Sequence, residues 1–314
     1  MKTVVAIGGN ALIAPGGRGD IGEQFARSRL VARTLADLVF QGCQVTVTHG
    51  NGPQVGSIMR RVEISSGEVY PIDLGLAVAD TQAGMGYMIS QTWRNEMHNR
   101  GRDRECIAIV TPVIVDADDP AFANPTKPIG PFLSEERARQ HAERDGWKIV
   151  EDAGRGWRRV VASPKPVAVE CIDTIKKLVA AGELIIAGGG GGIPVIINEK
   201  GERHGVEAVI DKDFTSAIIA ASVEADVLVL VTAVDHVYVN YGKPDQRGLT
   251  HVRVAEIEGH IADRQFPAGS MLPKIQAAVQ FLKDRGDPTA RAVIADLDKV
   301  PAALAGETGT TITL

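Results

Sequence analysis

Three lysines stand in sequence settings that could handle a phosphoryl group. Lys212 lies between Asp211 and Asp213, directly before an apolar helical segment. A helix N-terminus disfavours a cation, and a bound phosphate would reverse that penalty. The alternative is an aspartate N-cap with Lys212 in solvent, and for this segment alone that alternative is favoured. Prolines flank Lys127, and Lys274 begins another helical segment, so both matter only if the fold brings them together.

Two glycine-containing loops follow apolar runs at 3–7 and 44–48. Glycines at the carboxyl ends of parallel strands let backbone N–H groups approach an anion, at the edge where open α/β sheets bind ligands. Either loop alone could be a tight turn, but the pair predicts a nest of donors for an oxyanion. The candidate residues are Gly8, Gly9, Asn10, Gly50, Asn51 and Gly52. For the adjacent His49 a structural role is predicted, since no carboxylate or second histidine accompanies it.

Five consecutive glycines occupy 188–192. Each costs backbone entropy, so close approach to a polyphosphate is the predicted reason for them. A dinucleotide-binding fingerprint fails here, because Ile193 stands where the last small residue belongs and a strand-like run follows. No Gly-Lys-Ser/Thr follows any glycine run, which excludes a P-loop. An NAD-dependent oxidoreductase is therefore not supported, and ATP would be held by another fold.

The elements that must position these residues alternate between strand and helix. Near-continuous apolar runs, typical of strands buried on both faces of a parallel sheet, lie at 3–7, 44–48, 106–115, 183–187, 227–234, 291–295 and 310–314. Helical patterns between them lie at 22–41, 75–100, 166–181, 213–224 and 270–285. The predicted fold class is α/β, a three-layer αβα sandwich around a mainly parallel open sheet.

A proline-rich region at 118–165 breaks this alternation. The runs 147–150 and 157–161 flank a glycine-containing turn at 152–156, which predicts a β-hairpin, and a polar helix precedes it near 134–146. We predict one domain over 1–314, with 118–165 inserted as a protruding subdomain.

The composition narrows the class of partner. The 314 residues carry a net charge of −5, which argues against a broad nucleic-acid surface but allows a local basic pocket. Three well-separated cysteines form no CxxC pair, so neither a disulfide framework nor a zinc site is expected. No apolar stretch approaches the roughly 20 residues of a membrane span, and no signal peptide is evident. We expect a cytoplasmic protein without nucleic-acid or membrane partners.

The order of these motifs along the chain resembles that of the amino-acid kinase superfamily and, within it, the carbamate kinase family. The resemblance covers essentially the whole chain. The glycine loop after the first strand is shared across the superfamily, whereas the second loop, the Lys127 segment and the hairpin insertion are specific to the carbamate branch. The motifs are GGNA at 8–11, THGNGPQVG at 48–56, NPTKPIGPF at 124–132, GGGGGIPV at 188–195, EAVIDKDFTS at 207–216, VTAVDHVYVN at 231–240 and GSMLPKIQAA at 269–278.

One departure from the superfamily sharpens the resemblance. Ala6 stands where many members carry a lysine for the transferred phosphoryl group. In the carbamate branch a lysine of the protruding subdomain replaces it, and Lys127 matches that lysine. The resemblance further implies Lys212 and Lys274 as catalytic lysines, with Asp213 orienting them.

The resemblance also implies a carbamate side in the N-terminal half, including the two loops, and a nucleotide side over 183–314. The matching nucleotide-binding residues are Gly189, Gly190, Ala233, Asp235, Val237, Tyr241, Met271 and Pro273. It implies reversible phosphoryl transfer between ATP and carbamate, a homodimer and a place in arginine catabolism. Mg²⁺ is expected on the ATP phosphates and water, without a protein metal site. Another small-acid kinase and a non-catalytic metabolite sensor are the alternatives, and the retained lysines and Asp213 argue against the sensor.

Overall fold

The computed structural model describes residues 1–13, 17, 19–151, 156–267 and 269–314, without the side chains of Asn10 and Pro131. In these residues the largest sheet has eight strands in the order β15-β17-β16-β12-β1-β2-β9-β3. All neighbouring strands in it are parallel except β16 and β17. The strands are β1 (Lys2–Ile7), β2 (Gln44–His49), β3 (Cys106–Ala108), β9 (Leu184–Ile186), β12 (Val227–Thr232), β15 (His251–Arg253), β16 (Arg291–Asp296) and β17 (Thr310–Thr313).

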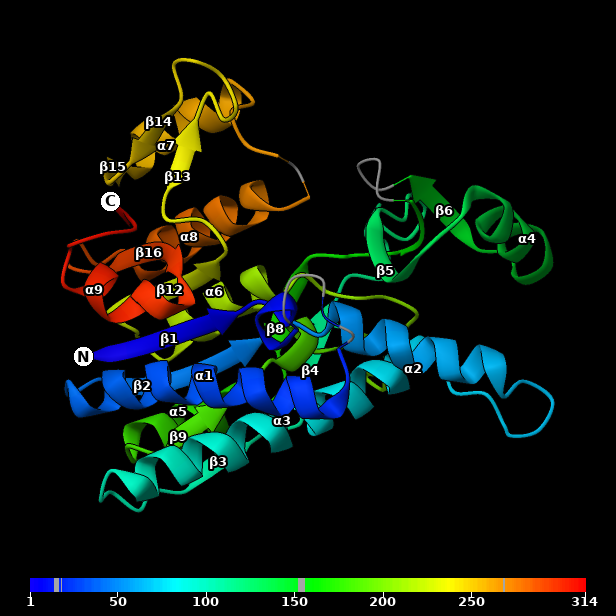
Figure 1. The fold of residues 1–314 in the computed structure, drawn as a ribbon, viewed down its shortest axis with the longest axis horizontal. Coiled ribbons are helices and arrows are strands. Elements are labelled where there is room, and N and C mark those ends of the chain that lie inside the picture. The colour runs from blue at the N-terminus through cyan, green and yellow to red at the C-terminus, as the bar shows by residue number, and fades with distance from the viewer. Residues whose placement is uncertain (14–16, 18, 152–155, 268) are drawn as a thin grey trace.

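Helices cover both faces of this sheet. In β1, Val4 and Ala6 enter one core cluster while Val5 and Ile7 enter the other, as expected for a strand buried on both sides. The first cluster lies under α5 (Ile172–Ala180), α6 (Lys212–Ser222) and α8 (Met271–Arg285), and the second under α1 (Ile21–Phe40), α3 (Leu74–Asn99) and α9 (Val300–Leu304). The helices α1 and α3 pack side by side along the sheet (Figure 1). The predicted three-layer sandwich is confirmed.

The apolar run 106–115 was predicted as one strand, and this is wrong. The main-sheet ladder ends because the N–H of Thr111 donates to Gln82 Oε1 at 2.7 Å instead of to a neighbouring strand. The helix predicted from 166 begins only at Ile172, because residues 166–169 pair with residues 113–115 as an antiparallel strand. A second sheet, β11-β10-β4-β8, results from β4 (Pro112–Val115), β8 (Pro166–Val169), β10 (Ile193–Ile197) and β11 (Arg203–Gly205).

A small antiparallel sheet projects from the main body together with α4 (Figure 1). Its order is β5-β7-β6, formed by β5 (Lys127–Leu133), β7 (Trp157–Val161) and β6 (Lys148–Glu151), and α4 spans Glu135–Asp145. The predicted pairing of β6 with β7 is confirmed, while the predicted turn at 152–155 lies outside the described residues. The edge strand β5 was missed, because its prolines lack a backbone donor and argue against a strand.

In the part of the chain that the structure describes, the remaining α-helices and strands are α2 and three short elements in the second half of the chain. Residues Gly52–Ile64 form α2, with Pro53 in its first turn, where the missing N–H of proline costs no helix hydrogen bond. In chain order, β13 (Val237–Val239) and β14 (Arg247–Leu249) follow β12, and α7 (Val254–Ala262) follows β15. Among the helices of the described residues, none combines the length and apolar character that a bilayer crossing requires.

Candidate functional site

The predicted lysines meet at two aspartates. Asp213 is shared by two of them: Lys212 bonds its Oδ1, and Lys274 Nζ lies 2.8 Å from its Oδ2. Lys127 Nζ reaches Asp211 Oδ2 at 2.7 Å across 84 positions of sequence. The N–H of Asp213 donates to Asp211 Oδ1 at 3.0 Å, which joins both groups at the start of α6. Elements β5, α6 and α8 therefore bring one lysine each to one cluster.

Burial governs the charges in this cluster. Lys212 is only 8% exposed, and burial lowers its pKa to about 8 against the opposing pull of Asp213. Burial also favours the neutral form of Asp213, but the charges of Lys212 and Lys274 outweigh it and hold the pKa of Asp213 below its usual range. Asp211 caps α6 as the simpler alternative predicted, whereas the solvated Lys212 of that alternative is wrong.

The cluster is suited to a small dianion. Three ammonium groups and two carboxylates leave one net positive charge when all are ionised. In a partly buried site such a charge acts more strongly than in water. Preorganised ammonium groups of this kind stabilise charge that develops on a transferring phosphoryl group.

The lowered pKa of Lys212 predicts a pH-dependent affinity for anions. A bound dianion favours the ammonium form, so above about pH 8 binding must take up a proton. We expect the affinity for sulfate, which does not titrate in this range, to be constant near pH 7. It should fall with rising pH above 8, approaching about tenfold per pH unit. Calorimetric titration from pH 6.5 to 9.5 measures this, and an unchanged affinity would contradict it. Lys212→Arg, which keeps its charge, should flatten the profile.

The two predicted anion loops lie against each other. A Cβ on Gly9 would lie 3.2 Å from the Gly50 carbonyl carbon, and one on Gly50 would lie 2.9 Å from the Gly9 nitrogen and 3.2 Å from Lys212 Cδ. The N–H of Gly50 donates to the Ile7 carbonyl at 2.9 Å, so Gly50 contributes close approach more than a donor. Gly52 begins α2, where first-turn N–H groups have no partners within the helix. Gly8 lies at the end of β1, while the side chain of Asn10 is outside the described part of the chain.

The glycine run 188–192 has a packing reason independent of any nucleotide. All five glycines are buried, and Gly188 and 190–192 have φ values between 61° and 97°. A Cβ on Gly191 would lie 2.4 Å from the Ile210 carbonyl oxygen, and one on Gly192 would lie 2.1 Å from Val113 Cγ2. Side chains are therefore excluded by neighbouring protein atoms. The nucleotide contacts of Gly189 and Gly190 stay predictions.

The other predicted nucleotide residues follow β12 or begin α8. Ala233 is exposed, Asp235 pairs with Lys299 Nζ at 2.7 Å, and Tyr241 is 63% exposed. Val237 lies in the core and its N–H donates to Thr310 Oγ1 at 2.8 Å, so its side chain faces away from solvent. Met271 and Pro273 precede Lys274 in the first turn of α8, which places them beside the lysine cluster.

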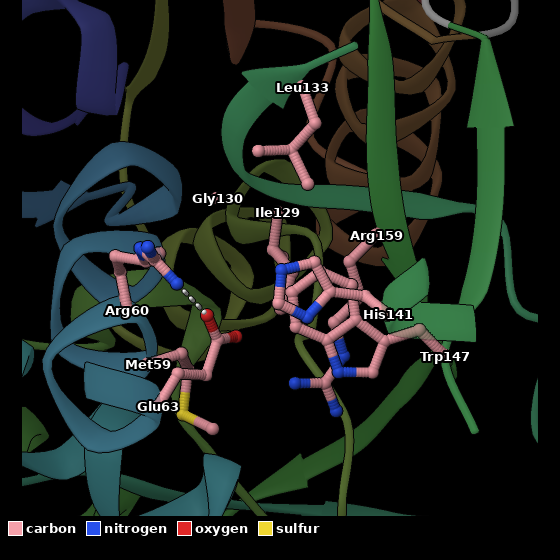
Figure 2. A pocket seen from close by; sticks show the side chains of 10 residues that line it. Met59, Arg60, Glu63, Ile129, Gly130, Leu133, His141, Trp147 and Arg159 are labelled. Carbon is pink, nitrogen blue, oxygen red and sulfur yellow. Dashed lines mark hydrogen bonds and ion pairs between the residues drawn. The ribbon is translucent and has the colours of Figure 1, made fainter. Parts of the chain in front are cut away.

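The projecting sheet is seated directly on α2. A Cβ on Gly56 would lie 2.3 Å from Gly130 Cα, so the backbones of α2 and β5 touch. Figure 2 shows the cavity beside this contact, with Met59, Arg60 and Glu63 of α2 on one side and side chains of the projecting sheet and α4 on the other. The cavity holds about 20 Å³, room for one water molecule. The contact with α2 fixes the position of β5, the strand that begins with Lys127.

Sequence reasoning missed two contributors. Asp211 was considered only as a possible helix cap, and its bond to Lys127 spans two distant segments. The aspartates on both sides of Lys212 were the available signal. Gln82 of α3 holds Thr111 N at 2.7 Å and Gly189 O at 2.7 Å, and nothing in its local sequence marks it.

Comparisons with known proteins agree with this geometry. A model of the amino acid kinase family matches residues 1–296. Carbamate kinases of Pyrococcus horikoshii and Staphylococcus haemolyticus are 45% and 46% identical, each over 99% of this chain and 99% of theirs. A solved carbamate kinase from Giardia lamblia, bound to AMP-PNP, is 37% identical with a TM-score of 0.91, covering 99% of this chain and 98% of that one. The chain belongs to the amino acid kinase family and, within it, to the carbamate kinases.

Proposed function

We propose that the protein catalyses reversible phosphoryl transfer between ATP and carbamate, forming ADP and carbamoyl phosphate. One observation carries the proposal: Lys127, Lys212 and Lys274 converge on Asp211 and Asp213 in a chain 45% identical to a curated carbamate kinase. The Giardia lamblia structure bound to AMP-PNP supports ATP and ADP as the nucleotides.

The chemistry needs charge stabilisation more than proton transfer. The carbamate oxygen is already anionic, so the reaction requires no general base. We propose that the three lysines contact the transferring group and offset the repulsion between the two anions. First-turn N–H groups of α2, beginning at Gly52, and the loop at Gly8 and Gly9 would bind the carbamate side.

A coupled assay tests the function. Purified protein, MgADP and carbamoyl phosphate are expected to yield ATP, read through hexokinase and glucose-6-phosphate dehydrogenase. Acetyl phosphate in place of carbamoyl phosphate distinguishes another small-acid kinase, for which it would be the better donor. ATP formation no greater than that of Lys212→Met would overturn the proposal.

We further propose that Mg²⁺ arrives with the nucleotide. Among the described residues no three His, Cys, Asp or Glu side chains group into a metal site, and Asp211 and Asp213 already accept hydrogen bonds from lysines. Mg²⁺ bound to the phosphates supplies charge neutralisation there. Excess EDTA is expected to abolish ATP formation. The Mg²⁺ concentration for half-maximal rate should rise with the ADP concentration, and a requirement set by protein concentration would contradict this.

The contact between α2 and β5 predicts a long-range effect on turnover. In Gly56→Ala the new methyl would meet backbone atoms of Gly130 at 2.3 and 2.5 Å, so β5 and Lys127 must shift. A displacement of about 1 Å can cost about 10²-fold in rate, and a loss of that order in kcat is expected. Gly84→Ala is the matched control, because its Cβ on α3 meets nothing within 4 Å. A folded Gly56→Ala protein with kcat within twofold of the parent would refute the seating role.

Several finer proposals rest on the family resemblance. They are a homodimer, a cytoplasmic location, a role in arginine catabolism, and the division into a carbamate side and a nucleotide side over 183–314. The free thiols of Cys43, Cys106 and Cys171 agree with a reducing compartment. The boundaries 118 and 165 of the inserted subdomain are likewise a proposal, supported by the small sheet and α4 that lie within them.

A further inference from the structure

His49 is a buried titratable residue that the proposed chemistry does not use. It ends β2, directly before the second anion loop, and is 1% exposed. Its Nδ1 lies 3.2 Å from the Gly50 carbonyl oxygen. Its Nε2 is buried with no hydrogen-bond partner among the described residues.

These contacts define the protonation of the ring. The Gly50 carbonyl can only accept, so Nδ1 carries the proton and Nε2 is bare. A second proton would place an N–H where no acceptor lies within the described surroundings, close to the charge of Lys212. Burial, with that charge adding to it, lowers the pKa of His49 to about 4. The ring is therefore neutral at ordinary pH.

The ring also occupies the space above the glycine run. A Cβ on Gly189 would lie 2.5 Å from His49 Nε2. A Cβ on Gly190 would lie 2.4 Å from Asn51 Nδ2, so the two side chains of the loop fill the spaces over two successive glycines. The loop after β2 and the glycine run are thus packed together through His49 and Asn51.

Helix α3 holds both partners of this packing. Thr81 Oγ1 accepts from Asn51 Nδ2 at 2.9 Å, and the next residue, Gln82, donates to Gly189 O at 2.7 Å. Both loops are therefore tied to one turn of a helix whose buried face belongs to the core. His49 is the member of this packing that bonds the backbone of the anion loop itself.

We propose that His49 is a positioning residue: its Nδ1–H holds the Gly50 carbonyl and its ring rests on Gly189, which keeps the loop after β2 in its anion-binding conformation. The inference deepens the proposed function and rests on it for the kinetic readout, because it assigns His49 to the carbamoyl phosphate side of the reaction. Sulfate binding, measured without turnover, tests it separately.

Three variants of His49 distinguish the effect of a hydrogen-bond donor at the Nδ1 position from the effect of side-chain volume. The amide of His49→Asn presents an N–H at the Nδ1 position, that of His49→Gln presents one near Nε2, and His49→Leu presents none. Leaving the partly buried Gly50 carbonyl without its donor is expected to raise the KM for carbamoyl phosphate about tenfold in the Leu and Gln variants. It should weaken sulfate binding by a similar factor, with the KM for ADP within twofold of the parent. The Asn variant should recover most of both losses.

The outcomes decide the proposal one way or the other. Each variant is measured at a temperature where circular dichroism shows it folded, and if the Leu variant does not fold, the Asn and Gln pair decides. Three results would overturn the proposal. The Asn and Gln variants could show equal KM values and equal sulfate affinities, or both could keep a sulfate affinity within twofold of the parent. The KM for ADP could also rise as much as the KM for carbamoyl phosphate. An inactive parent protein would sink the proposed function, while the sulfate measurements would still test His49.

Discussion

Lys212→Met is expected to lower kcat for ATP formation by about 10³-fold or more. Methionine keeps the length and apolar stem but removes the ammonium group of a residue that is only 8% exposed. Loss of a single preorganised donor to a developing charge costs about 10²–10³-fold, and here a full charge is lost as well. The cluster loses its net positive charge, since Lys127 and Lys274 then only balance Asp211 and Asp213.

The measurement is the initial rate in the coupled assay at saturating ADP and carbamoyl phosphate. Because we propose that Lys212 contacts the transferring group, kcat should fall much more than the KM for ADP rises. Lys200→Met, at an exposed position between β10 and β11, is the matched control and should keep the parent rate. A loss below about tenfold in folded Lys212→Met would remove this residue from the catalytic centre.

Lys127→Met is expected to lower kcat by about 10²–10³-fold. Ala6 leaves the end of β1 without the lysine that the superfamily resemblance would place there, and Lys127 of the projecting sheet bonds Asp211 at the start of α6. Its side chain is 33% exposed, so the missing charge is partly replaced by water and the loss should be smaller than at Lys212.

The control for this variant is Lys148→Met, an exposed lysine on β6 of the same small sheet. It separates the charge at the site from any general effect on the projecting sheet. Near-normal turnover of Lys127→Met would mean that the inserted subdomain serves the structure only. Lost turnover in both variants would point to the stability of that sheet instead of to the Lys127 ammonium group.

The central part of the fold could be predicted because its strands are buried on both faces. The runs that form β1, β12 and β16 are mostly apolar, while β2 alternates valine with threonine. All four strands are buried over most of their length, and helical segments separate them. The sequence of 106–115 does not show that two strands lie in it, since an apolar strand has the same pattern in either sheet. Its break depends on Gln82, a residue of another element.

The candidate site was predictable in part for a similar reason. The motifs around Lys127, Lys212 and Lys274 matched a known family, so their grouping followed from resemblance, whereas spacing alone left each as an ordinary lysine. Contacts between distant segments carried no local signal: Lys127 with Asp211 is one, and the glycine run beneath His49 is another. The glycines at 188–192 were predicted to leave space for a phosphate. In the structure, protein atoms already occupy the space next to these glycines.

Asp213 has a consequence for the steps between successive turnovers. It is a carboxylate that stays in place, bonded to Lys212 and Lys274, when substrate and product anions leave. Without Asp213, the two lysines would bind any entering dianion tightly and release it slowly. A resident counter-ion competes for both ammonium groups, so each departing anion is exchanged for one that the protein supplies. If the lysines hold the transferring group as proposed, we expect Asp213 to ease product release in either direction of the reversible reaction, at the expense of ground-state affinity.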